Sequence, residues 1–236
     1  MHFCKKVPMK GNSKEVESNQ EGIHRDLEKL VLRYLSAEYK RPIADHTKAS
    51  FEKAARFLEP FRAPIVLDSG CGTGLSTLSL AKRYPENPVL GIDKSEIRIG
   101  KAELQSAATD GIPSNVLFVR AELVDFWRLA LQENWDVRFH ALFYPNPWPK
   151  QSELRYRFHA HPVFPTLLRL SPEIELRTNW KIYADEFRAA LETANEKMHR
   201  YAKILEEEFS PKVPVSAFEK KFMDSGHTLF RVTAGQ

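Results

Sequence analysis

Two segments near the start of the chain repeat their apolar residues at the spacing of an amphipathic helix. Between His24 and Tyr39 the apolar positions recur every three or four residues with charged residues between them, which puts them on one helical face. The segment from Thr47 to Leu58 repeats this pattern and stops before Pro60, a residue that cannot continue a helix. The sequence therefore predicts an N-terminal helical extension over residues 21–62.

Five short apolar stretches then alternate with helical patterns. They are Pro64–Asp68, Pro88–Asp93, Val116–Arg120, Phe139–Tyr144 and Ile174–Thr178. Buried strands that alternate with helices are typical of a parallel sheet covered on both faces. We therefore expect a doubly wound, Rossmann-like α/β domain over residues 63–236.

The end of the chain has a different pattern. A charged segment that ends near Phe209 is predicted to be helical, and Pro211 and Pro214 interrupt the chain after it. A short helix is then expected at about Ala217–Met223, followed by an edge strand at His227–Thr233.

Composition and charge add broader expectations. The first twenty residues carry several lysines and glutamates and no apolar run that could serve as a signal sequence, so we expect a disordered tail over residues 1–20. No stretch reaches the roughly 18 uninterrupted apolar residues that a membrane span needs. Cys4 and Cys71 lie far apart, which argues against a structural disulfide and favours a cytoplasmic location. A net charge of +4 is compatible with a basic face that meets phosphates.

A glycine-rich turn follows the first predicted strand, where Asp68 is followed by Gly70, Gly72 and Gly74. Glycines permit positive φ and let the backbone approach a ligand closely. Dinucleotide enzymes also use such a loop. However, a carboxylate beside the turn would repel a pyrophosphate, whereas it can attract the ammonium of a methionine moiety. Asp68 therefore favours a cofactor that carries methionine.

Two further acids lie at the ends of the next strands. Asp93 ends the second strand, where a carboxylate can accept both hydroxyl groups of an adenosine ribose. Glu122 lies just past the third strand and could bond an adenine amino group. Asp68 and Asp93 could instead be helix-capping or surface acids. Cys71 is interpreted as a small loop residue rather than a catalytic thiol, because no histidine lies near it in sequence.

A proline-rich loop, Phe143–Lys150, follows the fourth strand and reads Phe-Tyr-Pro-Asn-Pro-Trp-Pro-Lys. Doubly wound folds bind ligands at this end of the sheet. Three prolines fix the backbone around Asn146 and Trp148. Such a stiff loop with an aromatic side chain suits a planar base, although a packing Trp in a rigid turn would have the same sequence.

The same loop resembles the (F/Y)-P-D-P-W-x-K signature of bacterial tRNA (guanine-N7)-methyltransferases. Thr178-Asn179-Trp180 with Tyr183 is similar to the T-D-W-x-x-Y of that family, and Ser216-Ala217-Phe218-Glu219 is similar to its T-x-F-E. Order and spacing agree over most of residues 64–231. The resemblance implies a class I S-adenosylmethionine-dependent methyltransferase with tRNA as its substrate.

The resemblance also implies roles for individual residues. The cofactor would contact Asp68, Gly70, Gly72, Gly74, Asp93, Glu122 and Asn146, with Asn146 also the catalytic residue. The substrate would contact Lys150, Asn179, Ser216 and Glu219. The chain departs from the family at Asn146 and Asn179, where the signatures have acids, and it lacks the usual Gly-Gly before the fifth strand. These departures bear on activity rather than on the fold.

Guanine N7 carries a lone pair, so its methylation requires orientation and proximity but no base. A carboxylate can accept twice from guanine, whereas an amide offers one acceptor oxygen and a donor. Two alternatives remain open. Asn146-Pro147-Trp148 also resembles the N-P-P-(Y/F/W) loop of methyltransferases that act on exocyclic amines, although the second proline is absent. The chain could also be a tRNA-binding paralogue without catalytic activity.

Basic and aromatic residues after the loop are candidates for RNA contact, because they can pair with phosphates and stack on unpaired bases. Acidic residues among them fit a solvated face equally well. His159 and His161 lack the spacing of a metal site and are interpreted as surface or capping groups, so no metal is expected. The sequence leaves monomer and homodimer open. The basic candidates are Arg155, Arg157, Arg169, Arg177, Lys181 and Arg188.

Overall fold

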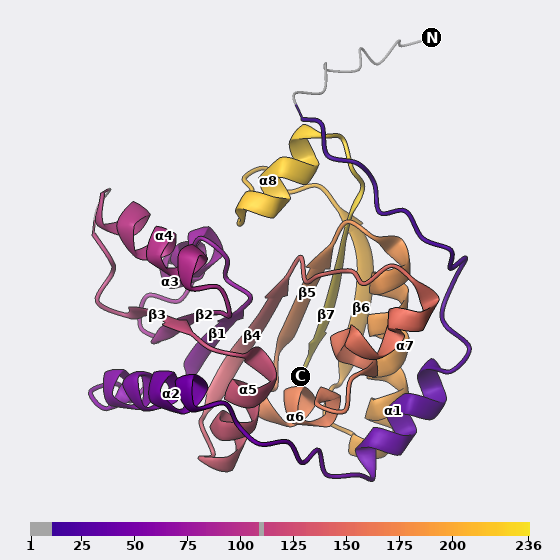
Figure 1. The fold of residues 1–236 in the computed structure, drawn as a ribbon, viewed down its shortest axis with the longest axis horizontal. Helices are drawn as coiled ribbons and strands as arrows, with labels where there is room; N and C mark the ends of the chain where they lie inside the picture. Colours follow the sequence, from indigo (N-terminus) through magenta and orange to yellow (C-terminus); the bar gives the residue numbers. More distant parts are fainter. Residues whose placement is uncertain (1–10, 109–110) are drawn as a thin grey trace.

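The computed structural model describes residues 11–108 and 111–236, which form one seven-stranded sheet in the order β3-β2-β1-β4-β5-β7-β6 (Figure 1). The first five strands in the chain are parallel. β7 runs antiparallel between β5 and β6. All five predicted parallel strands are confirmed, as is the α/β fold. The strands are β1 (Ile65–Ser69), β2 (Val89–Asp93), β3 (Val116–Arg120), β4 (Val137–Phe143), β5 (Ile174–Thr178), β6 (Lys203–Phe209) and β7 (Leu229–Gly235).

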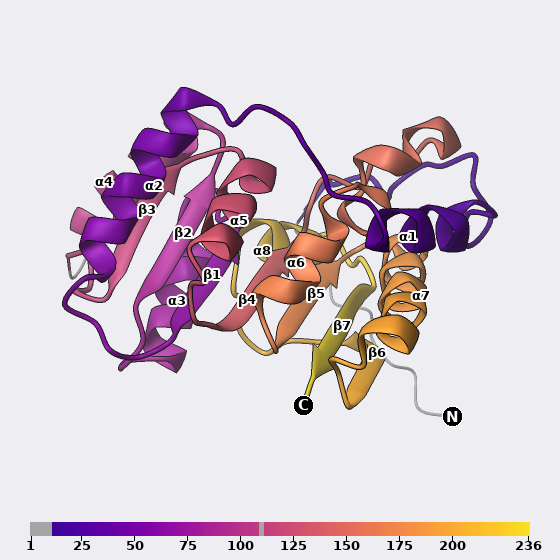
Figure 2. The same cartoon turned by 90° about the horizontal axis from the view of Figure 1, so that it is seen from below.

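Helices cover both faces of the sheet, and each face has its own apolar cluster (Figure 2). One cluster contains side chains of α1 (Leu27–Leu35), α2 (Asp45–Leu58), α5 (Leu123–Gln132), α6 (Phe164–Leu170) and α7 (Lys181–Met198). The other contains side chains of α3 (Leu75–Arg83) and α4 (Glu96–Ala107), and partly buried side chains of α8 (Ala217–Asp224) pack against it. Two short 3-10 helices, η1 (Gln151–Tyr156) and η2 (Phe158–Ala160), lie between β4 and α6.

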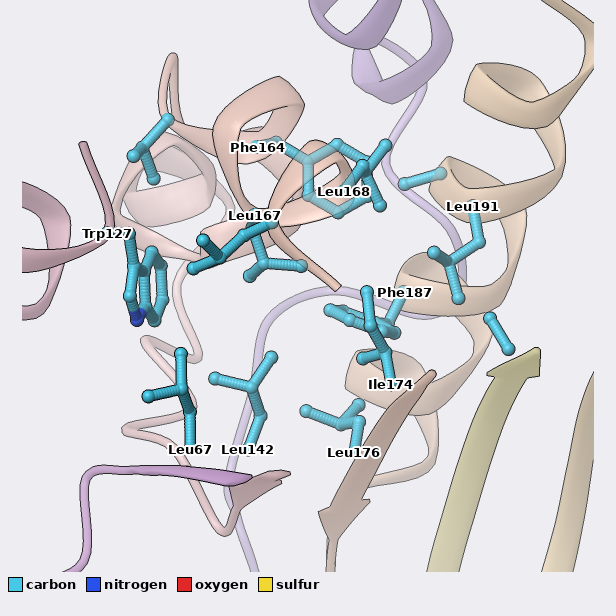
Figure 3. Close-up of a cluster of buried hydrophobic side chains, with 14 of the residues drawn as sticks. Leu67, Trp127, Leu142, Phe164, Leu167, Leu168, Ile174, Leu176, Phe187 and Leu191 are labelled. Atoms are coloured by element: carbon cyan, nitrogen blue, oxygen red, sulfur yellow. The ribbon is translucent and has the colours of Figure 1, made fainter. Parts of the chain in front are cut away.

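The larger cluster holds the sheet to its helices (Figure 3). Leu67 of β1 and Leu142 of β4 belong to it together with Leu167 of α6 and Phe187 of α7, and all four are fully buried. Burying a side chain of this size stabilises a fold by about 1.5–3 kcal/mol. This core fixes the strand ends from which the site is built.

The N-terminal helices pack on this same face, α1 against α7 and α2 against β3. Residues 11–26 precede them as an extended stretch that runs from α8 along the outside of the molecule to α1 (Figure 1). This stretch is tied to the fold at both ends, because Gly11 N donates to Asp224 O over 2.8 Å and Gln20 is buried. The expectation of a disordered tail is therefore wrong for residues 11–20, while residues 1–10 lie outside the described residues.

Two expectations for the end of the chain are wrong as well. Residues 203–209 form strand β6 rather than a helix, because α7 ends at Met198, His199 takes a left-handed φ of 48°, and the chain turns back to pair with β7. β7 lies inside the sheet, so β6 rather than β7 is the edge strand. Charges near Glu206 suggested a helix, but Glu206 faces Lys181 and Arg188 of α7. Among the described residues, no helix is long and apolar enough to cross a membrane.

Candidate active site

The parallel strands β1 to β5 bring their carboxyl ends to one edge of the sheet. The glycine loop follows β1, Asp93 ends β2, the proline-rich loop follows β4, and Asn179 follows β5. At this edge Tyr144 N donates to Arg177 O over 2.7 Å, and Gly70 N donates to Ile92 O over 2.7 Å. Ligands of doubly wound folds bind here.

Asp68 lies at the centre of this edge with only one of its carboxylate oxygens satisfied. Oδ2 accepts hydrogen bonds from the hydroxyl groups of Ser76 and Thr77, each at 2.6 Å. Oδ1 is buried and has no hydrogen-bond partner in the described part of the chain. Burial raises the pKa of Asp68 from 3.8 to about 6, against the lowering effect of the two hydroxyl groups. An unpartnered buried carboxylate oxygen is costly unless a ligand satisfies it.

The glycine loop leaves open space beside Asp68. Gly70, Gly72 and Gly74 have φ of 85°, 57° and 84°, a region that other residues rarely enter. A Cβ atom added at Gly70 or Gly72 would meet no atom within 4 Å, whereas at Gly74 it would lie 2.8 Å from Phe118 and Ala102. Gly74 therefore permits close packing of α3, while at Gly70 and Gly72 no other residue covers the backbone.

Asp93 is buried and connects two loops. Its Oδ2 accepts from Gly72 N at 3.1 Å, its Oδ1 accepts from Ser95 N at 2.8 Å, and Arg98 lies 3.7 Å away. Asp93 thus orders the glycine loop itself, in addition to any ligand contact. Glu122 is exposed at the start of α5. Its backbone N donates to Thr47 Oγ1 at 3.1 Å.

The proline-rich loop is strained at two points on either side of Asn146. Tyr144 and Trp148 have φ of 54° and 47°, and left-handed backbone at bulky residues persists only where neighbours hold it. Asn146 is exposed between them. The Trp148 ring lies 4.9 Å from the ring of Tyr156, which is itself 61% exposed. These two aromatic rings give the loop a surface suited to a base.

Tyr144 is held by a buried ion pair. Its hydroxyl donates to Glu219 Oε1 at 2.8 Å, and Arg177 Nη1 donates to the same oxygen at 2.9 Å. Arg177 Nε also donates to Glu175 at 2.6 Å, and Val215 N donates to Glu219 Oε2 at 2.7 Å. Burial and the Glu219 charge both raise the pKa of Tyr144, so the phenol keeps its proton. Glu219 is fully buried, and both of its carboxylate oxygens have protein partners. It therefore holds Tyr144 and Arg177 in place, whereas the resemblance implied a substrate contact.

Trp148 is held by a second buried ion pair. The Arg157 guanidinium donates to the Trp148 carbonyl oxygen from Nε at 3.1 Å and from Nη2 at 2.9 Å, and to Glu186 Oε2 from Nη1 at 2.5 Å. His159 donates to the same carboxylate at 2.9 Å, and Gln20 donates to its other oxygen at 2.6 Å. Burial alone would raise the pKa of Glu186, but His159 and Arg157 hold it at about 2.

These contacts correct several predictions about exposed groups. Arg157 and Arg177 are buried and cannot meet RNA phosphates. His159 is fully buried and bonded to Glu186, so it is not a surface group. Lys181 and Arg188 both pair with Glu206. The two remaining basic candidates, Arg155 and Arg169, are exposed, as is Lys150 of the proline-rich loop.

The other residues implied to contact substrate have defined places. Asn179 is half-buried, and its Nδ2 lies 3.0 Å from His227 Nδ1. Ser216 caps α8, because its Oγ accepts from Glu219 N at 3.0 Å. Lys150 is exposed at the start of η1. Asn179 and Lys150 therefore remain available to a substrate, whereas Ser216 already has a structural role.

A buried group that the sequence analysis missed lies beneath the glycine loop. Ser69 Oγ is 2.8 Å from His140 Nε2 and accepts from Trp127 Nε1 at 2.9 Å. Burial lowers the pKa of His140 to about 3, so the ring is neutral. These contacts join β1, β4 and α5 below Asp68.

The described residues contain no cluster of His, Cys, Asp or Glu side chains placed to hold a metal ion.

Comparisons with solved structures agree with this architecture. An antibiotic-related methyltransferase superposes with a TM-score of 0.54 at 16% identity, covering 84% of this chain and 97% of that one. The 16S rRNA methyltransferase KamB gives a TM-score of 0.54 at 14% identity, covering 84% and 95%. At these identities the likeness shows the fold alone.

Sequence comparisons give closer relatives. The tRNA (guanine-N(7)-)-methyltransferase of Leifsonia xyli subsp. xyli is 29% identical over 174 residues, which cover 71% of this chain and 74% of that protein. The protein of the same name from Escherichia coli K12 is 28% identical over 170 residues, covering 71% and 68%. The family model described as "Putative methyltransferase" matches residues 62–232. The chain therefore belongs to this methyltransferase family and is an S-adenosylmethionine-dependent methyltransferase.

Proposed function

We propose that this chain methylates N7 of a guanine in tRNA. The observation that carries the proposal is the rigid loop around Asn146, held at both ends by buried ion pairs next to the cofactor edge of the sheet. The relatives named as tRNA (guanine-N(7)-)-methyltransferases support the choice of base and of RNA. The exposed positions Lys150 and Arg155 near the loop are suited to phosphates.

We propose that Asp68, the glycine loop and Asp93 hold the cofactor. The unpartnered Asp68 Oδ1 suits the ammonium of the methionine moiety, and the open space beside Gly70 and Gly72 suits its close approach to the backbone. Asp93 has a second lone pair on each oxygen for ribose hydroxyl groups. Glu122 is exposed at the third strand end and is assigned to the adenine amino group.

The residues of the chain supply orientation rather than proton transfer. When bound, S-adenosylmethionine offers an electrophilic methyl group on a sulfonium. The Trp148 and Tyr156 rings provide a surface on which the guanine can stack, and Asn146 and Asn179 supply hydrogen bonds that fix the base with N7 toward the methyl group. Because N7 has no hydrogen to lose, no base is required, and positioning can account for several kcal/mol of the barrier.

The test is to incubate the protein with radiolabelled S-adenosylmethionine and unmodified bulk tRNA, and then to identify any methylated nucleoside. Formation of 7-methylguanosine supports the proposal. A nucleoside methylated on an exocyclic amine would identify the chain as an amine methyltransferase. Binding of tRNA without any methyl transfer would identify it as a non-catalytic tRNA-binding protein.

We also propose that the protein acts in the cytoplasm, where its tRNA substrate is found. Within residues 11–108 and 111–236, Cys71 is a free buried thiol, which supports this because reduced cysteines are typical of that compartment. The monomer and the homodimer are both compatible with the proposed activity. Sedimentation in the presence and absence of tRNA distinguishes them.

A further inference from the structure

Asn179 contacts a histidine whose own partner limits which way the amide faces. His227 Nε2 lies 2.9 Å from Ser13 O, and His227 Nδ1 lies 3.0 Å from Asn179 Nδ2. A carbonyl oxygen only accepts, so Nε2 must carry the hydrogen. In a ring with one hydrogen, Nδ1 is then the acceptor, and Asn179 must donate to it from Nδ2.

The consequence concerns the other end of the amide. Once Nδ2 is bound to His227, the carbonyl oxygen of Asn179 faces away from that ring, and no described residue donates to it. Asn179 follows β5 at the edge where the cofactor loop and the Asn146 loop meet. An amide free to turn could place either its NH2 group or its oxygen on the side away from the ring, whereas the His227 contact fixes the oxygen, an acceptor, on that side.

The histidine is itself held in place. His227 N donates to Phe222 O at 3.0 Å, and its ring stacks on the Phe222 ring at 5.2 Å. Ser13 is held by its backbone N, which donates to Ser225 Oγ at 3.0 Å. Close packing at Gly11 fixes the same stretch, since a Cβ there would lie 2.3 Å from Ser225 Oγ and 2.9 Å from the Asp224 carbonyl carbon.

We propose that His227 is a positioning residue, which Ser13 holds in one tautomer so that Asn179 acts as a fixed hydrogen-bond acceptor toward the substrate base. This inference rests on the proposed function, because the acceptor is assigned to the 2-amino group of the target guanine. Fixed in this way, the Asn179 amide presents an acceptor oxygen. The acid at this position in the resembled family presents an acceptor oxygen too. It also makes residues 11–13 part of the site, although they lie more than 160 residues from Asn179 in sequence.

The activity test uses three variants and two tRNA transcripts. His227→Ala frees the amide, His227→Gln keeps one acceptor and one donor, and Gly11→Ala displaces Ser13 without touching Asn179 or His227. Gly22→Ala is the matched control, because a Cβ at Gly22 meets no atom within 4 Å. The second transcript carries inosine, which lacks the 2-amino group, at the target position.

We expect His227→Ala and Gly11→Ala to lower kcat/KM for the guanine transcript by about five- to tenfold, the effect of one neutral hydrogen bond. For the inosine transcript, kcat/KM should fall by less than about twofold, because inosine has no 2-amino group to bond Asn179. His227→Gln should recover most of the activity, and Gly22→Ala should match the unaltered protein. Cofactor affinity and melting temperature serve as folding controls. Equal losses on both transcripts, or no loss in His227→Ala, would overturn the proposal.

A spectroscopic test remains decisive if the protein makes no 7-methylguanosine. The ¹⁵N shifts of histidine rings distinguish the two neutral tautomers, and the His227 signals are those missing from the His227→Gln spectrum. We expect the Nε2–H form in the unaltered protein and a mixture in Gly11→Ala. A ring with its hydrogen on Nδ1 would refute the positioning role whatever the enzyme's substrate, whereas failure of methyl transfer with the expected tautomer would refute only the proposed function.

Discussion

Replacing Asp68 with Asn separates the proposed role of this carboxylate from its structural role. Oδ2 accepts from Ser76 and Thr77, and the single oxygen of an Asn can still accept from both hydroxyl groups. The unpartnered Oδ1 then becomes an NH2 group, which faces the cofactor ammonium with the wrong polarity. Loss of a hydrogen bond to a charged group costs about 1.5–3 kcal/mol, so the Kd for S-adenosylmethionine should rise roughly ten- to a hundredfold.

Asp68→Asn should weaken cofactor binding, but its effect on the free energy of unfolding of the cofactor-free protein should be different. Burial raises the pKa of Asp68 from 3.8 to about 6, so the folded state holds an extra proton between these values and the free energy of unfolding falls as pH rises through them. The charged form therefore costs roughly 3 kcal/mol above pH 6. Asp68→Asn removes this cost but leaves a buried amide donor unpaired, at about 1–3 kcal/mol. We expect this cost and this gain to offset at pH 7.5, and the fall in the free energy of unfolding that Asp68 causes between pH 3.8 and about 6 to disappear.

Calorimetry and urea unfolding measure the two effects on the same samples. In the unaltered protein, cofactor affinity should rise with pH toward about 6 and then level off, because Asp68 must lose its proton to bind an ammonium. Asp125→Asn is the control. It alters a buried acid bonded to Ala44 N and Arg128, so it should lower stability and leave the Kd unchanged. An Asp68→Asn protein that binds the cofactor normally, or that unfolds while Asp125→Asn does not, would refute the reasoning.

Three further predictions concern the rest of the site. Asp93→Ala should weaken cofactor binding more than tenfold, because Asp93 also orders Gly72, and calorimetry checks it. The affinity for tRNA should fall steeply with salt, and Lys150→Ala with Arg155→Ala should reduce that slope in filter binding; an unchanged slope would remove both residues from the RNA surface. Arg157→Lys should lower kcat about tenfold with cofactor Kd unchanged, because one ammonium cannot replace a guanidinium that binds Trp148 O and Glu186 together. Arg56→Lys, on the exposed side of α2, is its control.

The repeat of apolar residues was enough to predict the five parallel strands and most helices, because burial on both faces leaves a local pattern in the sequence. It failed where the pattern was ambiguous. The segment 203–209 is rich in glutamate, which favours helix, yet pairing with β7 made it a strand. The order of β6 and β7 in the sheet depends on which of them pairs with β5. The local sequence of a strand does not show which neighbour it pairs with.

For the site, a short motif in the sequence was enough to select Asp68 and the glycines after it as candidates. It could not identify the partners of buried charges. The sequence offers Arg157 and Arg177 as candidates for a basic surface, but Arg157 is buried against Glu186 and Arg177 against Glu219. The members of each pair lie 29 and 42 residues apart, so only the folded chain shows that they meet.

The proposed methylation of guanine N7 needs no general base, and those two ion pairs supply what it needs instead, a fixed geometry. Burying a charged pair gains little net stability, and each pair here is bonded to one end of the loop that carries Asn146. Arg157 binds the carbonyl oxygen of strained Trp148, and Glu219 binds the hydroxyl of strained Tyr144. A transfer to a lone pair depends on distance and angle, so a loop held at both strained ends lowers the barrier by restricting motion. The buried charges are therefore better explained by the geometry of the loop than by the stability of the fold.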